Sequence, residues 1–431
     1  MIPAWMLIPF VVMLLCIAIL PLLPKVGEWW EENSHKLIIS LVLGIPVACW
    51  LCVNNLSESL IDEVVYEYVP FILLLMALFV TTGGICIRGD LKATPGVNTA
   101  ILGTGWFLAS LMGTTGAAML LIRLLLSTNQ QRQHRVHTVL FFIAAVANCG
   151  GLLSPLGDPP LFLLFQKGAP FFWWMQNMWT EWLVTGALLL GVYYCVDSYF
   201  YHKEPTVNLM ADVHEATKLK ATGLINVFWL LCVICSTLFL TPENFCNWFG
   251  YASAAEMPWY VKLLREWVFI AIIAGSWLTT SKQVRKDNNY SWAPILEVAC
   301  VFIGIFITMT PALEFLKENA ENIKAFINQP WQYVYCTGAL SAFLDNTPTA
   351  MVFNEMECGG AGVASDAFLK AISMGAVFFG ALTYIGNGPN FMVKSIAEQE
   401  GIKMPSFFGY MIKFSLIVCL PIYIIVQLLF I

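Results

Sequence analysis

Long apolar runs dominate the chain, and short polar segments separate them. Because a helix of about 20 apolar residues crosses the hydrocarbon core of a bilayer, each run is a candidate membrane segment. Strands of a membrane barrel would be about ten residues long with alternating polarity, so the pattern predicts helices instead. The predicted membrane segments are 3–23, 37–55, 69–88, 99–126, 138–166, 181–200, 222–240, 266–281, 292–312, 332–354, 367–396 and 406–431.

The run 99–126 differs from the others because both of its flanks are basic. Arg88 and Lys92 lie before its centre, and Arg123, Arg132 and Arg135 lie after it. Basic loops favour the cytoplasmic side, so a single crossing would leave one of these flanks outside. A re-entrant hairpin that enters from the cytoplasm and returns keeps both flanks inside, and the small and hydroxyl residues at its centre suit a buried tip.

The run 332–354 is predicted to be a second hairpin that opens outward, since its flanks are mixed to acidic and suit the outer face. With both hairpins in place the chain makes ten full crossings and has both termini outside. Most of its 22 Lys and Arg residues then lie on the cytoplasmic side, as the positive-inside bias requires.

Two interrupted segments match each other in sequence. Residues 154–163, "SPLGDPPLFL", pair with residues 383–392, "TYIGNGPNFM", and this pairing sets Asp158 against Asn387. Five crossings in each half is an odd number, so the second half would be inverted relative to the first, as in many secondary transporters. The predicted division is an N-terminal repeat at 1–205 with hairpin 99–126 and broken helix 138–166, a cytoplasmic linker at 206–221, and a C-terminal repeat at 222–431 with hairpin 332–354 and broken helix 367–396.

Glycine and proline residues mark the predicted interruptions. Proline removes a backbone donor and glycine tolerates unusual backbone angles, so both favour a break in a helix. An interrupted membrane helix exposes carbonyl and amide groups that can replace the hydration shell of a small ion. The residues predicted to form the breaks are Gly157, Pro159, Pro160, Pro348, Gly386, Gly388 and Pro389.

Two aspartates lie in these segments, Asp158 in the first break and Asp345 at the tip of the second hairpin. A carboxylate at the bilayer centre costs about 2.5–3.5 kcal/mol or more, so each aspartate indicates a functional site. Neither motif contains Lys or Arg, which leaves a proton or a cation to balance the charge. The alternative is helix capping, because Asp is a good N-cap and Pro159 a good first helical residue.

Side-chain oxygens near the two aspartates are candidate ligands for the ion. In membrane helices Ser, Thr and Asn also form hydrogen bonds between helices, which is the alternative for each of them. The candidate ion- and proton-binding residues are Asp158, Asp345, Asn346, Thr347, Asn387, Thr383, Ser154, Thr114, Thr115, Asn148 and Asn390, with Na⁺ bound at the two aspartates.

Composition narrows the function classes further. The chain is 58% hydrophobic and only 12% charged, which is typical of a polytopic membrane protein. Its net charge of −6 and dispersed basic residues give no nucleic-acid-binding surface. The 13 cysteines are interpreted as reduced packing residues, and three loop histidines, His134, His137 and His202, as solvated. The N-terminal run lacks a basic leader region and is interpreted as a retained span.

The two motifs resemble the ion transporter superfamily, which includes NhaD-type sodium/proton antiporters, arsenite permeases and citrate carriers. "GGLLSPLGDPPLF" is similar to the NhaD-type pattern of a Gly pair followed by Ser/Thr-Pro-hydrophobic-Gly-Asp. "SAFLDNTPTAM" resembles the Ser-Ala-x-x-Asp-Asn-x-Pro signature of the antiporter and arsenite-permease branches. The resemblance implies inverted repeats and a homodimer of scaffold and transport domains. The chain departs from the NhaD-type pattern at Pro159 and Pro160, where that branch has hydroxyl residues.

The sequence therefore predicts an all-α polytopic transporter, not an enzyme, in the inner membrane of a bacterium. Its partners would be the lipid bilayer, protons and small inorganic cations, and no cofactor is expected. The first hypothesis is antiport of Na⁺ or Li⁺ against H⁺ at Asp158 and Asp345. The alternatives are a cation-coupled citrate or dicarboxylate transporter, which two carboxylates at the site would disfavour through repulsion, and an arsenite-type anion permease.

Overall fold

The computed structural model describes residues 2–23, 25–30, 32–253, 256–360 and 362–431. Its regular structure is helical apart from two paired strands, β1 (Cys86–Asp90) and β2 (Thr217–Thr222). The chain divides into two compact units. The first unit comprises Met1–Cys86 and Thr222–Phe315, and the second comprises Ile87–Ala221 and Leu316–Ile431. Each unit thus takes segments from both halves of the chain. The two repeats, 1–205 and 222–431, are a division based on matching sequence segments, and this division stays a prediction.

The protein is an all-α polytopic membrane protein, as the sequence predicted. Six helical segments of the described residues are long and apolar enough to span a bilayer, or seven if the bent pair Ile225–Phe239 and Pro242–Phe249 is counted as one span. The ten expected crossings include helices that are shorter, such as the 16-residue helix Leu264–Thr279. The six segments are Asn33–Val53, Ser57–Thr82, Val136–Leu153, Trp179–Tyr201, Ala293–Asn319 and Phe407–Phe430.

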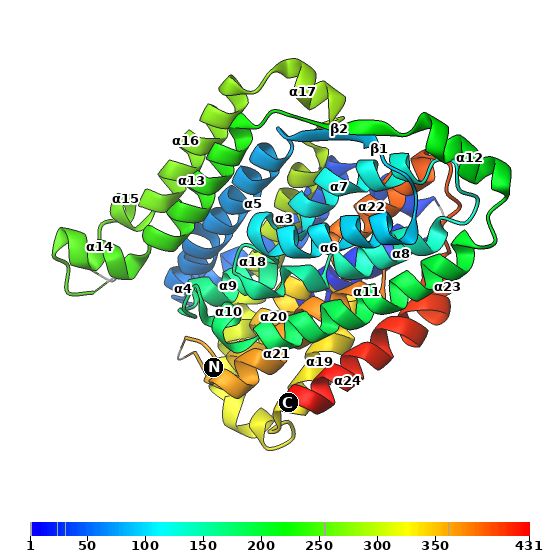
Figure 1. Ribbon diagram of the computed structural model, residues 1–431. Helices are drawn as coiled ribbons and strands as arrows, with labels where there is room; N and C mark the ends of the chain where they lie inside the picture. Colours follow the sequence, from blue (N-terminus) through cyan, green and yellow to red (C-terminus); the bar gives the residue numbers. More distant parts are fainter. Residues whose placement is uncertain (1, 24, 31, 254–255, 361) are drawn as a thin grey trace. The chain divides into compact units, whose positions relative to one another are not determined.

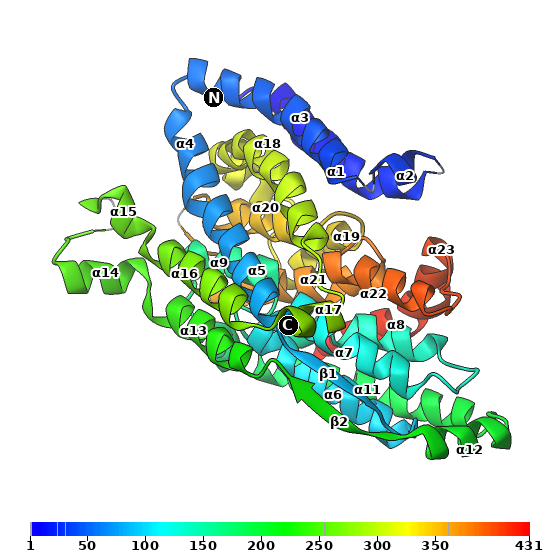
Figure 2. The ribbon, with the colours of Figure 1, turned by 90° about the horizontal axis from the view of Figure 1, so that it is seen from above.

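The first unit is built around a group of three helices that lie side by side, α5, α13 and α16 (Figure 2). A second group packs α3 on α18 through Val47, Leu51 and Ile307. The elements of this unit are η1 (Ala4–Leu7), α1 (Ile8–Ile19), η2 (Leu20–Leu22), α2 (Val26–Trp30), α3 (Asn33–Val53), α4 (Ser57–Ile61), η3 (Asp62–Tyr68), α5 (Val69–Thr82), α13 (Ile225–Phe239), α14 (Pro242–Phe249), α15 (Trp259–Lys262), α16 (Leu264–Thr279), α17 (Lys282–Asp287) and most of α18 (Ala293–Lys324).

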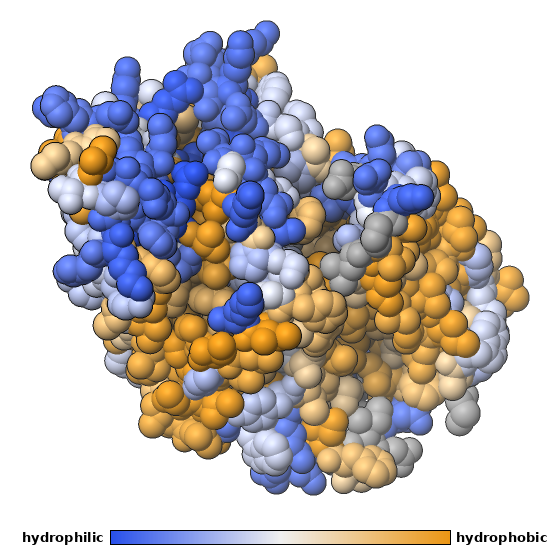
Figure 3. Space-filling model, turned by 90° about the vertical axis from the view of Figure 1, so that its right-hand side faces the viewer, coloured by the Kyte–Doolittle hydropathy of each residue, from blue (hydrophilic) through white to orange (hydrophobic). Residues whose placement is uncertain are grey.

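Several helices expose apolar side chains at helical spacing, as expected for surfaces that face lipid. On α3, Ile38, Val42 and Ile45 are 52%, 65% and 54% exposed. These positions are four and three residues apart, so they form one apolar stripe along the helix. Figure 3 shows large continuous areas of hydrophobic surface, with hydrophilic residues gathered at one edge of the view.

The second unit contains both predicted hairpins and both predicted broken helices. Figure 1 shows α6 and α7 side by side in this unit. Its elements are α6 (Pro95–Met112), α7 (Thr114–Thr128), α8 (Val136–Ala145), η4 (Cys149–Leu153), α9 (Pro159–Gln166), α10 (Trp173–Asn177), α11 (Trp179–Tyr201), α12 (Thr206–Glu215), α19 (Pro330–Phe343), α20 (Asn346–Cys358), α21 (Asp366–Phe379), η6 (Gly380–Leu382), α22 (Gly388–Gln399), α23 (Phe407–Tyr410), η7 (Met411–Cys419) and α24 (Leu420–Phe430).

Each hairpin turns at the place that the sequence indicates. The first turns at Gly113, whose φ of 82° favours glycine, between α6 and α7. The second turns at Leu344 and Asp345, between α19 and α20. The broken helices are α8–η4–α9 and α21–η6–α22, and in both a non-helical segment, 154–158 or 383–387, separates the short 3-10 turn from the second helix. The second unit therefore places two hairpin tips and two helix breaks close together.

Candidate functional site

The two helix breaks have the same backbone conformation. Asp158 has φ and ψ of −144° and 143°, and its sequence partner Asn387 has −152° and 139°. Ser154 and Thr383 match in the same way, at −150° and 158° against −137° and 168°. The pairing found in the sequence therefore corresponds to equivalent positions in three dimensions.

Equivalent glycines close the backbone of each break on itself. A Cβ added at Gly157 would overlap the carbonyl oxygen of Gly151, and one at Gly386 would lie 2.6 Å from that of Gly380. Both separations are too short for a real side chain, so glycine is required for this close approach. The predicted role of Gly157 and Gly386 in the breaks thus has a specific geometric reason.

A hydroxyl group from each break ties it to the neighbouring hairpin. Ser154 Oγ donates to the carbonyl of Ser110 on α6, and Thr383 Oγ1 donates to that of Ala342 on α19. Because these hydroxyls are committed to backbone carbonyls, Ser154 and Thr383 hold the breaks in position in this conformation. Their assignment as ion ligands stays a prediction.

The carboxylate of Asp158 is the centre of a buried polar cluster. Its Oδ1 accepts from Thr114 Oγ1 at 2.9 Å and from Asn387 Nδ2 at 3.0 Å, and its Oδ2 accepts from Asn346 Nδ2 at 2.6 Å. All four residues are buried, and they come from both hairpin tips and both breaks. The structure thus brings together four of the residues that the sequence singled out.

Each of these four side chains stands at the start of a different helix. Thr114 and Asn346 are the first residues of α7 and α20, while Asp158 and Asn387 are the N-caps of α9 and α22. Helix N-termini carry about half an elementary positive charge each and expose backbone amides. Four such ends meeting at one cluster create a site that suits negative charge.

The predicted break prolines occupy the first turns of these helices. Pro159 and Pro160 open α9, Pro389 is the second residue of α22 after Gly388, and Pro348 is the third residue of α20. Proline lacks the amide that is unbonded in a first turn anyway, so it favours the start of a helix. The prolines therefore define where the second helix of each pair begins.

Asn148 and Asn390 form a second layer behind this cluster. Asn148 Nδ2 donates to Asn390 Oδ1 at 2.6 Å, and Asn148 Oδ1 accepts from Asn387 Nδ2 at 3.2 Å. Asn390 Nδ2 donates to the carbonyls of Gly380 and Thr383. These amides join the two breaks to each other and orient Asn387 toward Asp158.

We expect Asn148→Ala to weaken cation binding by about tenfold while the chain stays folded, as loss of an outer-layer hydrogen bond does at ion sites. The substitution frees the amide of Asn387 to turn away from Asp158. The measurement is the cation concentration that gives half-maximal transport in proteoliposomes. An unchanged half-maximal concentration would contradict the orienting role of Asn148.

Asp345 has the geometry of a helix cap. Its Oδ1 accepts from the backbone amide of Thr347 at 2.9 Å, and its carbonyl accepts from Thr349 Oγ1. Thr347 Oγ1 in turn donates to Asn346 Oδ1 at 3.3 Å. This fits the capping alternative that the sequence left open, and the ion-binding role of Asp345 stays a prediction. Thr115, half-buried on α7, is joined to the cluster by no hydrogen bond between described residues.

The hydrogen-bond donors around Asp158 are all neutral. Thr114, Asn346 and Asn387 supply them, and no salt bridge to Asp158 occurs among the described residues. Groups of three or more His, Cys, Asp or Glu side chains suited to a metal ion are also absent from the described part of the chain.

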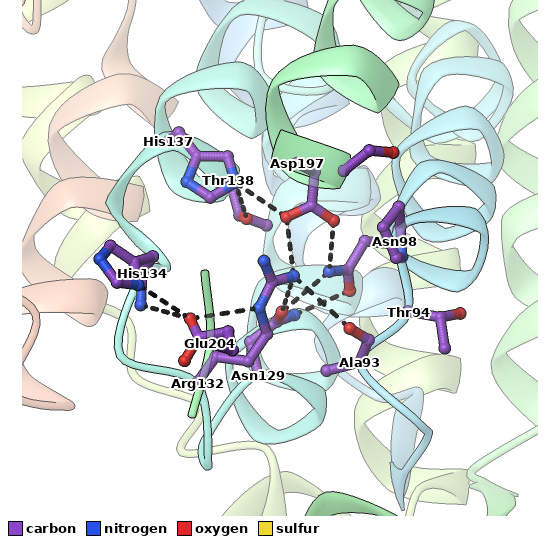
Figure 4. A network of polar contacts seen from close by, with 12 residues as sticks. Ala93, Thr94, Asn98, Asn129, Arg132, His134, His137, Thr138, Asp197 and Glu204 are labelled. Atoms are coloured by element: carbon purple, nitrogen blue, oxygen red, sulfur yellow. Dashed lines mark hydrogen bonds and ion pairs between the residues drawn. The ribbon is translucent and has the colours of Figure 1, made fainter. Parts of the chain in front are cut away.

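The second unit has another buried polar cluster, centred on Arg132, that the sequence analysis missed (Figure 4). Arg132 Nη1 lies 2.7 Å from Asp197 Oδ1, and His137 Nε2 lies 2.8 Å from the same oxygen. The side chain of His137 is only 11% exposed. Its interpretation as a solvated loop residue was therefore wrong, because the partner carboxylate is 60 residues away in the chain.

Glu204 anchors the loop that carries Arg132. Its carboxylate accepts from the backbone amides of Gln133 and His134 at 3.0 and 2.8 Å. Burial alone would raise the pKa of Glu204, but these amides, His134 and Arg132 together hold it below the ordinary 4.5. A carboxylate with a lowered folded-state pKa stabilises the fold above its unfolded pKa, and this contribution is lost as the pH falls through the folded value.

We expect Glu204→Gln to lower the free energy of unfolding by about 1–3 kcal/mol at neutral pH, since it weakens charge-assisted hydrogen bonds to buried groups. The difference from wild type should shrink as the pH falls below about 4.5. Thermal unfolding in detergent across this pH range measures it, with the exposed Glu400→Gln as control. A pH-independent difference would contradict the role of the ionised carboxylate.

Comparison with known proteins places the chain in a transport family. A comparison with curated proteins found no match. The full length of the chain, residues 1–431, matches the family CitMHS_2, described as "Putative citrate transport". This match agrees with the resemblance to the ion transporter superfamily at the coarser level of a multi-pass membrane transporter. We conclude that the chain belongs to the CitMHS_2 citrate transport family.

Proposed function

We propose that the chain is a cation-coupled citrate transporter in which Asp158 binds the coupling cation. The observation that carries this proposal is the meeting of four helix N-termini at one buried carboxylate. Such ends bind carboxylate groups in transporters, while backbone carbonyls at helix breaks bind the coupling ion. The family of the chain agrees with this substrate class.

The charges at the site suggest an order of binding. Four helix ends of about half a positive charge each roughly balance the two carboxylates of Asp158 and Asp345. A bound cation then makes the site positive, which attracts an anionic substrate. Cation binding therefore precedes citrate binding, and the repulsion expected from the two aspartates is removed by the cation.

Antiport of Na⁺ or Li⁺ against H⁺ is the second candidate. The specific observation in its favour is that all hydrogen-bond donors to Asp158 are neutral. A carboxylate in this setting can alternate between a cation and a proton without any further substrate.

Proteoliposomes that contain the purified chain and an internal pH dye test the proposal. Radiolabelled citrate is added with Na⁺, Li⁺, K⁺ or Mg²⁺ in turn, and citrate uptake and internal pH are followed together. Citrate uptake that requires a cation, with saturation by that cation, supports the proposal. Proton flux driven by Na⁺ alone, with no citrate uptake under any condition, contradicts it and favours the antiporter.

A further inference from the structure

The cluster around Arg132 carries an unbalanced buried charge. The Arg132 guanidinium faces two carboxylates, with Nη1 2.7 Å from Asp197 Oδ1 and Nε 3.8 Å from Glu204 Oε1. The exposed fractions of the three side chains are 1%, 0% and 0%. One positive and two negative charges leave a net charge of −1 in a site that excludes water. Buried charge without compensation is costly, so the cluster favours one additional positive charge.

Two histidines are positioned to supply that charge. His137 Nε2 lies 2.8 Å from Asp197 Oδ1, and His134 Nδ1 lies 3.2 Å from Glu204 Oε1. Both rings stack on Phe200, at centroid distances of 4.7 and 5.4 Å. His134 is 40% exposed whereas His137 is 11% exposed. A proton on His137 would therefore balance the buried charge directly, and the more exposed His134 lies next to solvent.

The carboxylate of Asp197 also holds the open end of the first hairpin, where α6 begins and α7 ends. Asn98 on α6 and Asn129 after α7 exchange two amide hydrogen bonds of 2.8 Å, which join the two arms of the hairpin. Asn98 Nδ2 also donates to Asp197 Oδ2 at 3.1 Å. Asp197 on α11 thus links His137, Arg132 and the hairpin, and Figure 4 shows these side chains converging. The far end of this hairpin is the tip that contributes Thr114 to the Asp158 cluster.

We propose that the Arg132 cluster is a proton-binding site in which His137 takes the proton, and that its occupancy controls how firmly the first hairpin is held to α11. A protonated His137 attracts Asp197 and keeps it in place between Arg132 and Asn98. A neutral His137 leaves the net negative charge, which weakens the attachment. Histidine is the side chain best suited to take up and release a proton in such a site.

The other charged groups around the cluster do not supply the missing charge. Asp212 on α12 accepts from the amide of Ala93 at 3.1 and 3.0 Å and interacts electrostatically with Arg132, Lys92 and Asp90. Arg135 donates to the carbonyl of Glu400. On α22, which packs on α8, Lys394 pairs with Glu398 at 3.7 Å.

Histidine NMR of the purified chain, labelled with ¹³C-histidine in detergent, tests proton binding without any transport substrate. The chain has 5 histidines, and the His137→Gln variant identifies the signal of His137. We expect the fraction of His137 that is protonated near neutral pH to fall in Asp197→Asn, because that substitution removes the carboxylate that faces the ring at 2.8 Å. Glu204→Gln should lower this fraction as well, and it replaces Asp197→Asn if the latter fails to fold.

A transport assay tests control by the same site. His137→Gln keeps a side-chain donor for Asp197 but cannot take a proton. We expect the transport rate of wild type to change with pH and that of His137→Gln to lose this change. The control is His202→Gln, because His202 is exposed and its ring contacts the backbone carbonyl of Ser198. A protonated fraction of His137 that is unchanged in both charge variants, or a His137→Gln pH profile identical to wild type, overturns the proposal.

Discussion

Asp158→Asn should strongly reduce cation-dependent transport while the chain remains folded. The amide has nearly the same shape as the carboxylate, but it removes the charge that a cation needs. Both oxygens of the Asp158 carboxylate accept hydrogen bonds, from Thr114 on one side and Asn346 on the other. The amide of Asn has one NH₂ group, which must face one of these two donors. Loss of a charge-assisted interaction of about 3 kcal/mol corresponds to a reduction on the order of 100-fold in transport at low cation concentration.

The matched comparison is Asp345→Asn at the neighbouring hairpin tip. Asn is as good an N-cap as Asp, so this variant keeps the hydrogen bond to the amide of Thr347. We expect it to lose less transport activity than Asp158→Asn, because it removes one charge from the site but leaves the cap of α20 and the carboxylate of Asp158 in place. Uptake of radiolabelled citrate, and Na⁺-driven proton flux, are measured for both variants at equal amounts of reconstituted protein. Wild-type activity in Asp158→Asn would show that transport does not need the charge of Asp158, whose side chain would then serve only as a hydrogen-bond partner of Thr114, Asn346 and Asn387.

The sequence was sufficient to single out the four side chains that meet at the carboxylate of Asp158. The breaks were visible because glycine and proline recur in register 229 positions apart, as Gly157 and Gly386 do, with Asp158 set against Asn387. A helix break needs glycine and proline for its own backbone geometry, so these residues mark a break in the sequence without knowledge of its distant contacts. The hairpin tips followed from the charge of their flanks, which depends only on the positive-inside bias.

Contacts between distant segments were beyond reach of the sequence. The bond from Asn148 to Asn390 joins residues 242 positions apart, and that from His137 to Asp197 joins residues 60 apart. Nothing in the local pattern distinguishes such an asparagine from one that bonds to a neighbouring helix. Ser110, which bonds to the backbone of the first break through its hydroxyl, was missed for the same reason.

The partial positive charges of helix N-termini, which belong to the backbone and not to side chains, distinguish citrate transport from antiport in our proposal. Counting carboxylates at Asp158 and Asp345 favours a site for cations alone. The ends of α7, α9, α20 and α22 add partial positive charges that become apparent only when the helices are seen to begin at the same cluster. Together with the family of the chain, these helix ends favour an anionic substrate carried with a cation.

Gly157→Ala should produce the largest loss of stability among substitutions at the breaks. The added methyl group would overlap the carbonyl oxygen of Gly151, and the carbonyl of Gly157 itself accepts the amide of Thr114 at 2.8 Å. The break would have to open, and the start of α7 would move with it. Overpacking of this kind typically costs about 1–3 kcal/mol, and here the obstacle is backbone that cannot rotate away.

Thermal unfolding in detergent and transport in proteoliposomes measure the effect. Gly191→Ala is the control, because Gly191 lies on α11 with open space around its Cβ position and alanine favours a helix. Gly386→Ala, whose Cβ would lie 2.6 Å from the carbonyl oxygen of Gly380, should lower the Tm less than Gly157→Ala. Equal Tm values for Gly157→Ala and Gly191→Ala would contradict the closed geometry of the first break. Loss of transport in Gly386→Ala would show in addition that the second break, which has no carboxylate of its own, is needed to place Asn387 against Asp158.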